Sequence, residues 1–268
     1  MQLIMNYGRE NLELNIPDTW DTVLIKKKPM PLLDNTADAL ANALAKPVGC
    51  PPISELVRGK QSACILICDI TRPVPNGIIL PLLVKNLLAA GLDRKNIRIL
   101  VATGLHRPNE GDELREVVGD DWVFENITVQ NHFARNDEDH VDLGHTSLGT
   151  RVLLDKRLVE ADLRIVVGLV EPHFMAGYSG GRKLIMPGVA HEKTITYLHN
   201  ARFMGDVRAC NGNLKGNPLH EQQLEIVEML GGALAVNSVI DEHRRVTFIN
   251  FGEIIRSHLL AVEFMRPY

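Results

Sequence analysis

The sequence has little that would direct the protein to a membrane, an oxidising compartment or a nucleic acid. Its four cysteines form no C-x-x-C pair and no zinc-ligand spacing, so we expect free thiols, buried at Cys64 and Cys68, in place of a disulfide. The apolar runs are of strand length, far short of a membrane span, and the opening residues do not resemble a secretory leader. The formal charge of -4 gives no reason to expect a nucleic-acid or anionic-membrane partner. We therefore expect a cytosolic protein.

What is present is a globular composition with alternating secondary-structure signals. The 268 residues, 45% hydrophobic and 23% charged, suffice for one large α/β domain or two smaller ones. Apolar, β-branched runs without polar alternation indicate strands covered on both faces. The expected strands are 63–69, 96–104, 125–131, 149–155 and 163–170, and the expected helices are 76–91, 109–119 and 156–162. This order predicts a doubly wound, mostly parallel, Rossmann-like α/β sheet.

Outside this alternation the pattern changes. An N-terminal β-hairpin is expected from residues 2–7 and 12–16, followed by a helix at 35–47. Near the C-terminus we expect a helix at 216–232, a strand pair at 233–240 and 244–251, and a helix at 252–268. The first helix has Asn35 or Thr36 as its expected N-cap, and Pro47 ends it. The polar segment 131–149 is expected to loop over one end of the sheet.

Three polar motifs follow three of the expected strands directly. They are DITRPVPN (69–76), TGLHRPN (103–109) and EPHFMAGYSGGRKLIMPG (171–188). Ligands of doubly wound sheets bind at the carboxyl ends of the strands. We therefore expect the three motifs to converge on one site.

The glycine-rich motif matches neither familiar phosphate-binding template. Leu184 follows the lysine where a P-loop requires Ser or Thr, and the glycine spacing differs from G-x-G-x-x-G. The loop can instead aim backbone N–H groups and basic side chains at an anion, from Ser179, Gly180, Gly181, Arg182 and Lys183. The alternative is a tight strand-to-helix turn with solvated basic residues.

The other two motifs contribute an arginine and a histidine. Arg72 lies between a strand and a helix N-terminus, a good position for a bidentate grip on a carboxylate or phosphate, unless it forms a structural pair with Asp69. A single loop histidine such as His106 is more often structural. Since His173 is expected at a neighbouring strand end, however, the two imidazoles can serve one pocket as acid and base.

Two further histidines follow the glycine-rich loop. His191 and His199 are eight residues apart, which would place them on one face of a helix. An H-E-x-x-H zinc site is excluded because Ile195 stands where its second histidine should be. His199 stays a candidate metal ligand, although imidazole suits nickel, copper, iron and zinc alike.

Taken together, these motifs resemble the nickel-pincer-dependent lactate racemase family. The family pattern is D-x-T-R-P, then G-x-H-R-P, then P-H-x-x-A-G-x-S-G-G-R-K and a histidine. This sequence supplies DITRPVP, TGLHRP, EPHFMAGYSGGRKLIMPG and YLHN in that order, from Asp69 to Asn200. The third motif is long enough to be specific.

The resemblance implies a cofactor, a nickel ion held in an organic pincer built on a pyridinium mononucleotide with sulfur arms. It implies that Lys183 forms a covalent thioamide link to this cofactor and that His199 ligates the nickel. His106 and His173 would be the acid/base residues, and Arg72 would contact the substrate carboxylate. The resemblance places the cofactor phosphate at the two loop segments, against Asp69, Thr71, Ser179, Gly180 and Gly181.

The implied reaction is racemisation or epimerisation of a small 2-hydroxy acid, with lactate as the default substrate. One histidine would remove the hydroxyl proton while the Cα hydride moves to the cofactor, and the other would reprotonate the oxygen after the hydride returns to the opposite face. Loading implies the enzymes that make the cofactor as partners. The sequence does not indicate an oligomeric state.

Family members normally continue into a second α/β domain that closes over the cofactor. We expect residues 1–255 to form the cofactor-binding domain and residues 256–268 to begin an interdomain helix or linker, with the second domain absent from this chain. A docked terminal helix in a naturally short homologue is the other interpretation. A truncated chain is expected to lack racemase activity, because its site would be open to water.

Two other functions fit parts of the pattern. A non-catalytic nucleotide- or phosphate-binding domain would use the glycine-rich loop but would have no use for His106, His173 and His199 together. A metal-dependent hydrolase or lyase would use the histidines and Asp69 directly on a metal, without an organic adduct.

Overall fold

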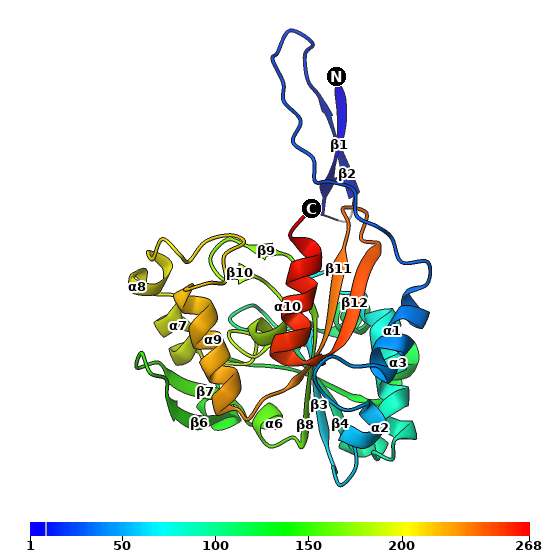
Figure 1. Ribbon diagram of the computed structural model, residues 1–268, viewed down its shortest axis with the longest axis vertical. Coiled ribbons are helices and arrows are strands. Elements are labelled where there is room, and N and C mark those ends of the chain that lie inside the picture. The colour runs from blue at the N-terminus through cyan, green and yellow to red at the C-terminus, as the bar shows by residue number, and fades with distance from the viewer. Residues whose placement is uncertain (9) are drawn as a thin grey trace. The chain divides into compact units, whose positions relative to one another are not determined.

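The computed structural model describes residues 1–8 and 10–268, and internal contacts divide the chain into two compact units (Figure 1). Residues 1–29 with Tyr268 form the smaller unit. It contains an antiparallel hairpin of β1 (Gln2–Tyr7) and β2 (Glu10–Asn15), which confirms the predicted N-terminal hairpin. Arg9, in the predicted turn, lies outside the described residues.

The larger unit, residues 30–267, is built around a six-stranded sheet. Its strand order is β12-β11-β8-β3-β4-β5, and all neighbours pair in parallel except β11 and β12. The strands are β3 (Ala63–Cys68), β4 (Ile97–Ala102), β5 (Thr128–Asn131), β8 (Leu163–Leu169), β11 (Leu234–Ile240) and β12 (Val246–Glu253). The doubly wound, mostly parallel sheet is therefore confirmed.

Strand β3 shows why these runs lack polar alternation. Ala63, Ile65 and Ile67 pack into the core on one face of the sheet, whereas Cys64 and Leu66 pack into the core on the other. Successive side chains point to opposite faces of a strand, so a strand covered on both sides must be apolar at every position.

Helices cover both faces of this sheet (Figure 1). One face carries α1 (Thr36–Ala45), α2 (Ile53–Leu56), α3 (Asn76–Ala89), α4 (Gly111–Val118) and α5 (Asp121–Asn126). The other carries α6 (Lys156–Val159), α7 (Glu192–Leu198), α8 (Ala201–Met204), α9 (Pro218–Met229) and α10 (Ile254–Met265). Asn35 caps α1 by accepting from two backbone N–H groups, as predicted. No helix among the described residues is long and apolar enough to cross a bilayer.

One sequence prediction in this region is wrong. The polar segment 131–149 contains η2 (Asp137–Asp139) and a strand, β6 (His140–His145), that pairs antiparallel with β7 (Arg151–Asp155) outside the main sheet. Because no residue of β6 is fully buried, polar residues are tolerated along it, and they concealed the strand in the sequence.

The C-terminal helix is part of the larger unit. The residues of α10 that are buried in this unit are Ile254, Ser257, His258, Ala261, Val262 and Met265. His258 reaches the glycine-rich loop, where its Nε2 lies 2.8 Å from the carbonyl oxygen of Ser179. A domain boundary at residue 255 stays a prediction.

Candidate functional site

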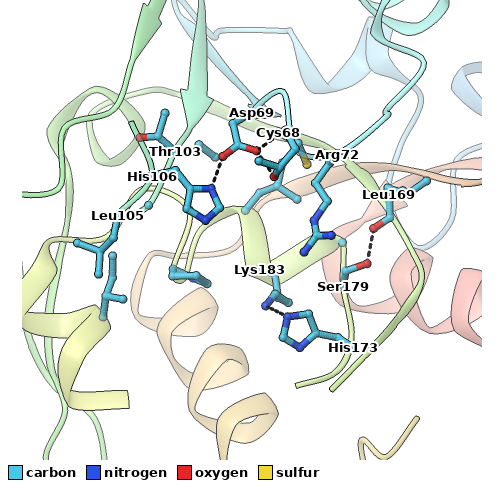
Figure 2. Close-up of a pocket in the computed structure, with 18 of the residues that line it drawn as sticks. Cys68, Asp69, Arg72, Thr103, Leu105, His106, Leu169, His173, Ser179 and Lys183 are labelled. Atoms are coloured by element: carbon cyan, nitrogen blue, oxygen red, sulfur yellow. Dashed lines mark hydrogen bonds and ion pairs between the residues drawn. The ribbon is translucent and has the colours of Figure 1, made fainter. Parts of the chain in front are cut away.

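The three motifs converge on one cavity at the carboxyl ends of β3, β4 and β8, as predicted (Figure 2). Its volume is about 510 Å³. Of the ten residues predicted for the site, nine line this cavity: Asp69, Thr71, Arg72, His106, His173, Ser179, Gly180, Lys183 and His199. Gly181 packs instead against His258, where an added Cβ would meet the imidazole ring at 3.1 Å. Strand order reverses between β3 and β8, which is where ligands of doubly wound sheets bind.

The glycine-rich loop is fastened to the strand that precedes it. After the short pair β9 (Pro172–His173) and β10 (Gly177–Tyr178), the Ser179 hydroxyl donates to Leu169 O at 2.7 Å and accepts from Glu171 N–H at 3.0 Å. Gly180 has a φ of +76°, and a Cβ there would lie 2.7 Å from Val170 Cγ2. The close approach therefore requires glycine, and the Ser179 hydroxyl is already engaged within the protein.

Asp69 organises the motif after β3. Its Oδ1 accepts from the Thr71 hydroxyl at 2.5 Å and from the Thr71 N–H at 3.1 Å, and its Oδ2 lies 2.5 Å from His106 Nδ1. Asp69 is buried, whereas the His106 side chain is 62% exposed toward the cavity and solvent. Because a carboxylate repels phosphate, any phosphate contact made by this segment falls to Thr71 or to backbone N–H groups.

Arg72 forms an ion pair with Glu171, and the structural pair with Asp69 considered from the sequence does not form. Arg72 Nη1 lies 3.2 Å from Glu171 Oε1; both side chains are partly exposed, and Arg72 lines the cavity. The guanidinium of Arg72 is thus placed to bind a carboxylate, and in this structure it binds the carboxylate of Glu171.

Lys183 and His173 contact each other inside the cavity. Lys183 Nζ lies 3.0 Å from His173 Nε2 (Figure 2). Burial, together with the charges of Arg182 and Arg72, lowers the pKa of Lys183 to about 7. Burial and the Lys183 charge lower the pKa of His173 to about 3. The pair therefore carries less positive charge at neutral pH than its residue types suggest.

The sequence predicted that Arg182 adds charge toward an anion, but its side chain does not line the cavity. Its side chain is 2% exposed and points away from the cavity, donating to Ala176 O at 2.9 Å and lying 3.0 Å from His258 Nε2. Burial lowers the pKa of Arg182 to about 9. Arg182 therefore acts on the cavity through its charge, from below the loop.

His191 and His199 do not share a helix face as the spacing predicted, because α7 covers only the residues between them. His191 is the N-cap of α7 and lies buried, 3.0 Å from Asp137. His199 follows the last turn, where its Nδ1 lies 2.7 Å from Ile195 O, and it lines the cavity. With Nδ1–H donating to a carbonyl, Nε2 has a free lone pair, which is the usual arrangement of a metal-ligating histidine.

A metal held by protein side chains alone would need several ligands together. In the described part of the chain, no group of three or more His, Cys, Asp or Glu side chains is arranged to hold a metal ion. The hydrolase or lyase hypothesis, which places the histidines and Asp69 directly on a metal, requires such a group.

Several cavity residues were not singled out from the sequence. They include the apolar side chains of Leu105, Phe174, Met175 and Ile195, and the Thr103 and Thr196 side chains. Glu171 was missed as the partner of Arg72, although both belong to the motifs that were recognised. Nothing in the local pattern distinguishes these residues from ordinary loop or helix residues.

The fold and the site define an α/β domain whose cavity, at the carboxyl ends of its strands, combines two histidines, an arginine and a buried lysine. The family described as the lactate racemase N-terminal domain matches residues 7–212. This chain belongs to that family.

Two curated relatives are lactate racemases. Those of Lactiplantibacillus plantarum and Thermoanaerobacterium thermosaccharolyticum are 35% and 34% identical to this chain over 85% and 97% of its length. The chain spans 54% and 61% of the length of these relatives.

Solved structures show the same fold. The lactate racemase apoprotein from Thermoanaerobacterium thermosaccharolyticum superposes with a TM-score of 0.86 and 32% identity, covering 98% of this chain and 62% of that one. A protein of known structure from Thermotoga maritima shares the fold with a TM-score of 0.67 at 22% identity, over 79% of this chain and 55% of that one.

Proposed function

We propose that this chain is the cofactor-binding domain of a racemase or epimerase for a small 2-hydroxy acid, with lactate as the default substrate. The convergence of the predicted residues on one cavity carries this proposal: Arg72, His106, His173, Lys183 and His199. In this reaction each direction uses one residue as the base and another as the acid toward the substrate hydroxyl, and His106 and His173 reach the cavity from different strand ends (Figure 2). The names of the relatives and of the family support the same reaction.

The proposed cofactor is the nickel-pincer nucleotide, and the residues present fit it. Lys183 opens into the cavity, and a pKa near 7 leaves much of its amine neutral for a covalent bond. His199 has Nε2 free for nickel because Nδ1 is engaged by Ile195 O. The cavity volume lies within the range of about 300–1,000 Å³ that is usual for cofactor sites. When bound, the cofactor would supply hydride acceptance and return.

The chain's own residues would supply position and proton transfer. Arg72 would leave Glu171 and grip the substrate carboxylate in its place. Asp69 fixes the Nδ1–H tautomer of His106, so that Nε2 can accept the hydroxyl proton of the substrate. The apolar side chains of Leu105 and Phe174 would border a small alkyl group and restrict water.

Co-expression with the cofactor-making enzymes tests this function. Intact mass and nickel content are measured on wild type and on Lys183→Ala. We expect wild type to gain a mononucleotide-sized adduct and about one nickel ion per chain, and Lys183→Ala to lose the covalent adduct.

The other outcomes of this experiment separate the competing hypotheses. Metal without an organic adduct in wild type would support the hydrolase or lyase hypothesis. A nucleotide that dissociates on denaturation, without metal, would support the non-catalytic binding domain. Either result would contradict the proposed function.

A further inference from the structure

The contacts of His173 determine where its proton lies. Nδ1 of His173 faces the backbone N–H groups of Met175 at 3.4 Å and Ala176 at 3.2 Å. An N–H group donates, so Nδ1 must act as the acceptor and carry no proton. A neutral imidazole bears one proton, and an imidazolium bears one on each nitrogen. His173 is therefore the neutral tautomer with its proton on Nε2.

This tautomer fixes the state of Lys183. His173 Nε2 lies 3.0 Å from Lys183 Nζ, so the Nε2–H donates to the lysine nitrogen. An ammonium group has three donors and no acceptor, whereas a neutral amine has a lone pair. The contact is a hydrogen bond only when Lys183 is neutral.

The surroundings favour the same state. Lys183 belongs to the glycine-rich loop and follows Arg182, whose buried guanidinium contacts Ala176 O and His258. The charged or titratable groups that act on Lys183 and His173 are Cys68, Arg72, Glu171, Arg182 and His199. The carboxylate in this set, Glu171, is paired with Arg72. Burial and the neighbouring cations thus both oppose an ammonium at Lys183.

We propose that His173 is a positioning residue for Lys183, holding its amine neutral and ready for acylation until the lysine has reacted. This inference rests on the proposed function, in which Lys183 is the attachment point of the cofactor. Thioamide formation makes a bond between Nζ and the carbon of a thiocarboxylate arm and breaks the bond from that carbon to its oxygen, which leaves with both bonding electrons and one amine proton as hydroxide. The acylated nitrogen no longer offers a lone pair, so the same reaction frees the Nε2–H of His173 for the substrate.

Limited acetylation with acetic anhydride at pH 7 tests the state of Lys183 in the unloaded chain. Peptide mass spectrometry compares Lys183 with Lys85 and Lys215, which are exposed. We expect Lys183 to react at least about tenfold faster, because an ordinary lysine with a pKa of about 10.4 is almost wholly protonated at pH 7. Reaction no faster than at Lys85 and Lys215 would overturn the proposal.

Nitrogen-15 NMR of labelled histidine tests the tautomer directly, with His173→Gln used to assign the signals. We expect an unprotonated Nδ1 and a protonated Nε2 at pH 7, and a shifted Nε2–H signal after acetylation of Lys183. Since glutamine retains an N–H donor, we expect His173→Gln to keep the fast acetylation and His173→Ala to slow it about fivefold or more. A protonated Nδ1 at pH 7, or equal rates in the two variants, would overturn the proposal.

These measurements do not depend on the cofactor. Fast acetylation of Lys183 without a nucleotide adduct after co-expression would leave this inference standing and remove the proposed function. A nucleotide adduct on Lys183 combined with slow acetylation would support the proposed function and remove this inference.

Discussion

The Oδ2 atom of Asp69 lies 2.5 Å from Nδ1 of His106, and the other oxygen of the same carboxylate holds Thr71. The two residues come from different strand ends, after β3 and β4, and parallel pairing of these strands brings them together. The contact keeps the proton of His106 on Nδ1 and directs Nε2 toward the cavity. Asp69 therefore positions the proposed base.

Replacing Asp69 by Asn should reduce kcat of the cofactor-loaded enzyme by about 10- to 100-fold, because a hydrogen-bonded partner that fixes a functional histidine typically contributes this much. His106→Ala should cost about 10²–10⁴-fold, the usual contribution of a general acid or base. The measurement is the initial rate of racemisation as a function of pH. An Asp69→Asn enzyme with an unchanged rate and pH profile would remove the positioning role.

Replacing Glu171 by Gln should lower KM for the 2-hydroxy acid and leave kcat nearly unchanged. The substrate carboxylate no longer has to displace Glu171 from Arg72, although the pair is partly exposed and such pairs contribute only about 0–1 kcal/mol. A decrease in KM of about two- to fivefold is expected. Arg72→Lys, which loses the bidentate geometry, should raise KM instead. A higher KM for Glu171→Gln would show that Glu171 supports the substrate.

Replacing His199 by Ala should separate the metal from the organic part of the cofactor. The imidazole Nε2 is the proposed nickel ligand, whereas the covalent bond is proposed at Lys183, so the variant should lose nickel and keep the adduct. Nickel analysis and intact mass of the same sample provide the comparison. The matched control is His191→Ala, which removes a histidine that caps α7 and lies beside Asp137. Equal nickel loss in both variants would argue against a specific ligand at His199.

The sequence sufficed to predict that the three motifs share a site, because each one directly follows a strand of a parallel sheet. The position of each motif after its strand also predicted which residues lie in the loops. Nine of the ten predicted site residues line the cavity. The sequence did not predict the direction in which each side chain points. Arg182 and Lys183 are adjacent in the short η3 turn (Gly181–Leu184), yet one points beneath the loop and the other into the cavity.

Contacts between loops could not be predicted from the sequence either. The Asp69–His106 and Arg72–Glu171 pairs each join two motifs that are far apart in the chain. Local pattern supplies no signal for such pairs, because only the packed sheet determines which loop residues meet. The extent of α7 was missed for a related reason: His191 caps the helix through its own side chain, so the helix starts after it.

Buried histidines should make the protein less stable in mild acid. His220 is 6% exposed, its Nδ1 has no hydrogen-bond partner among the described residues, and burial lowers its pKa to about 3. The unfolded chain takes up this proton near pH 6.5 and the folded chain does not. The contribution of neutral His220 to the free energy of unfolding is therefore complete above pH 6.5 and is lost as pH falls toward 3.

Urea unfolding of wild type and His220→Leu at pH 7 and pH 5 tests this loss of stability in acid. The free energy of unfolding should fall by about 1–2 kcal/mol more in wild type than in the variant between these two pH values. His243→Leu, at a histidine whose side chain is 68% exposed, should behave as wild type. Parallel losses in all three proteins would mean that His220 does not contribute.

We propose that Lys183 anchors a nucleotide cofactor in the cavity at the ends of β3, β4 and β8. Peptide mapping by mass spectrometry, after co-expression with the cofactor-making enzymes, locates any covalent adduct on the chain. We expect a mononucleotide-sized mass increase on the peptide that contains Lys183, with fragment ions assigning it to that side chain. An adduct on a different residue, or fully loaded protein with an unmodified Lys183, would contradict it.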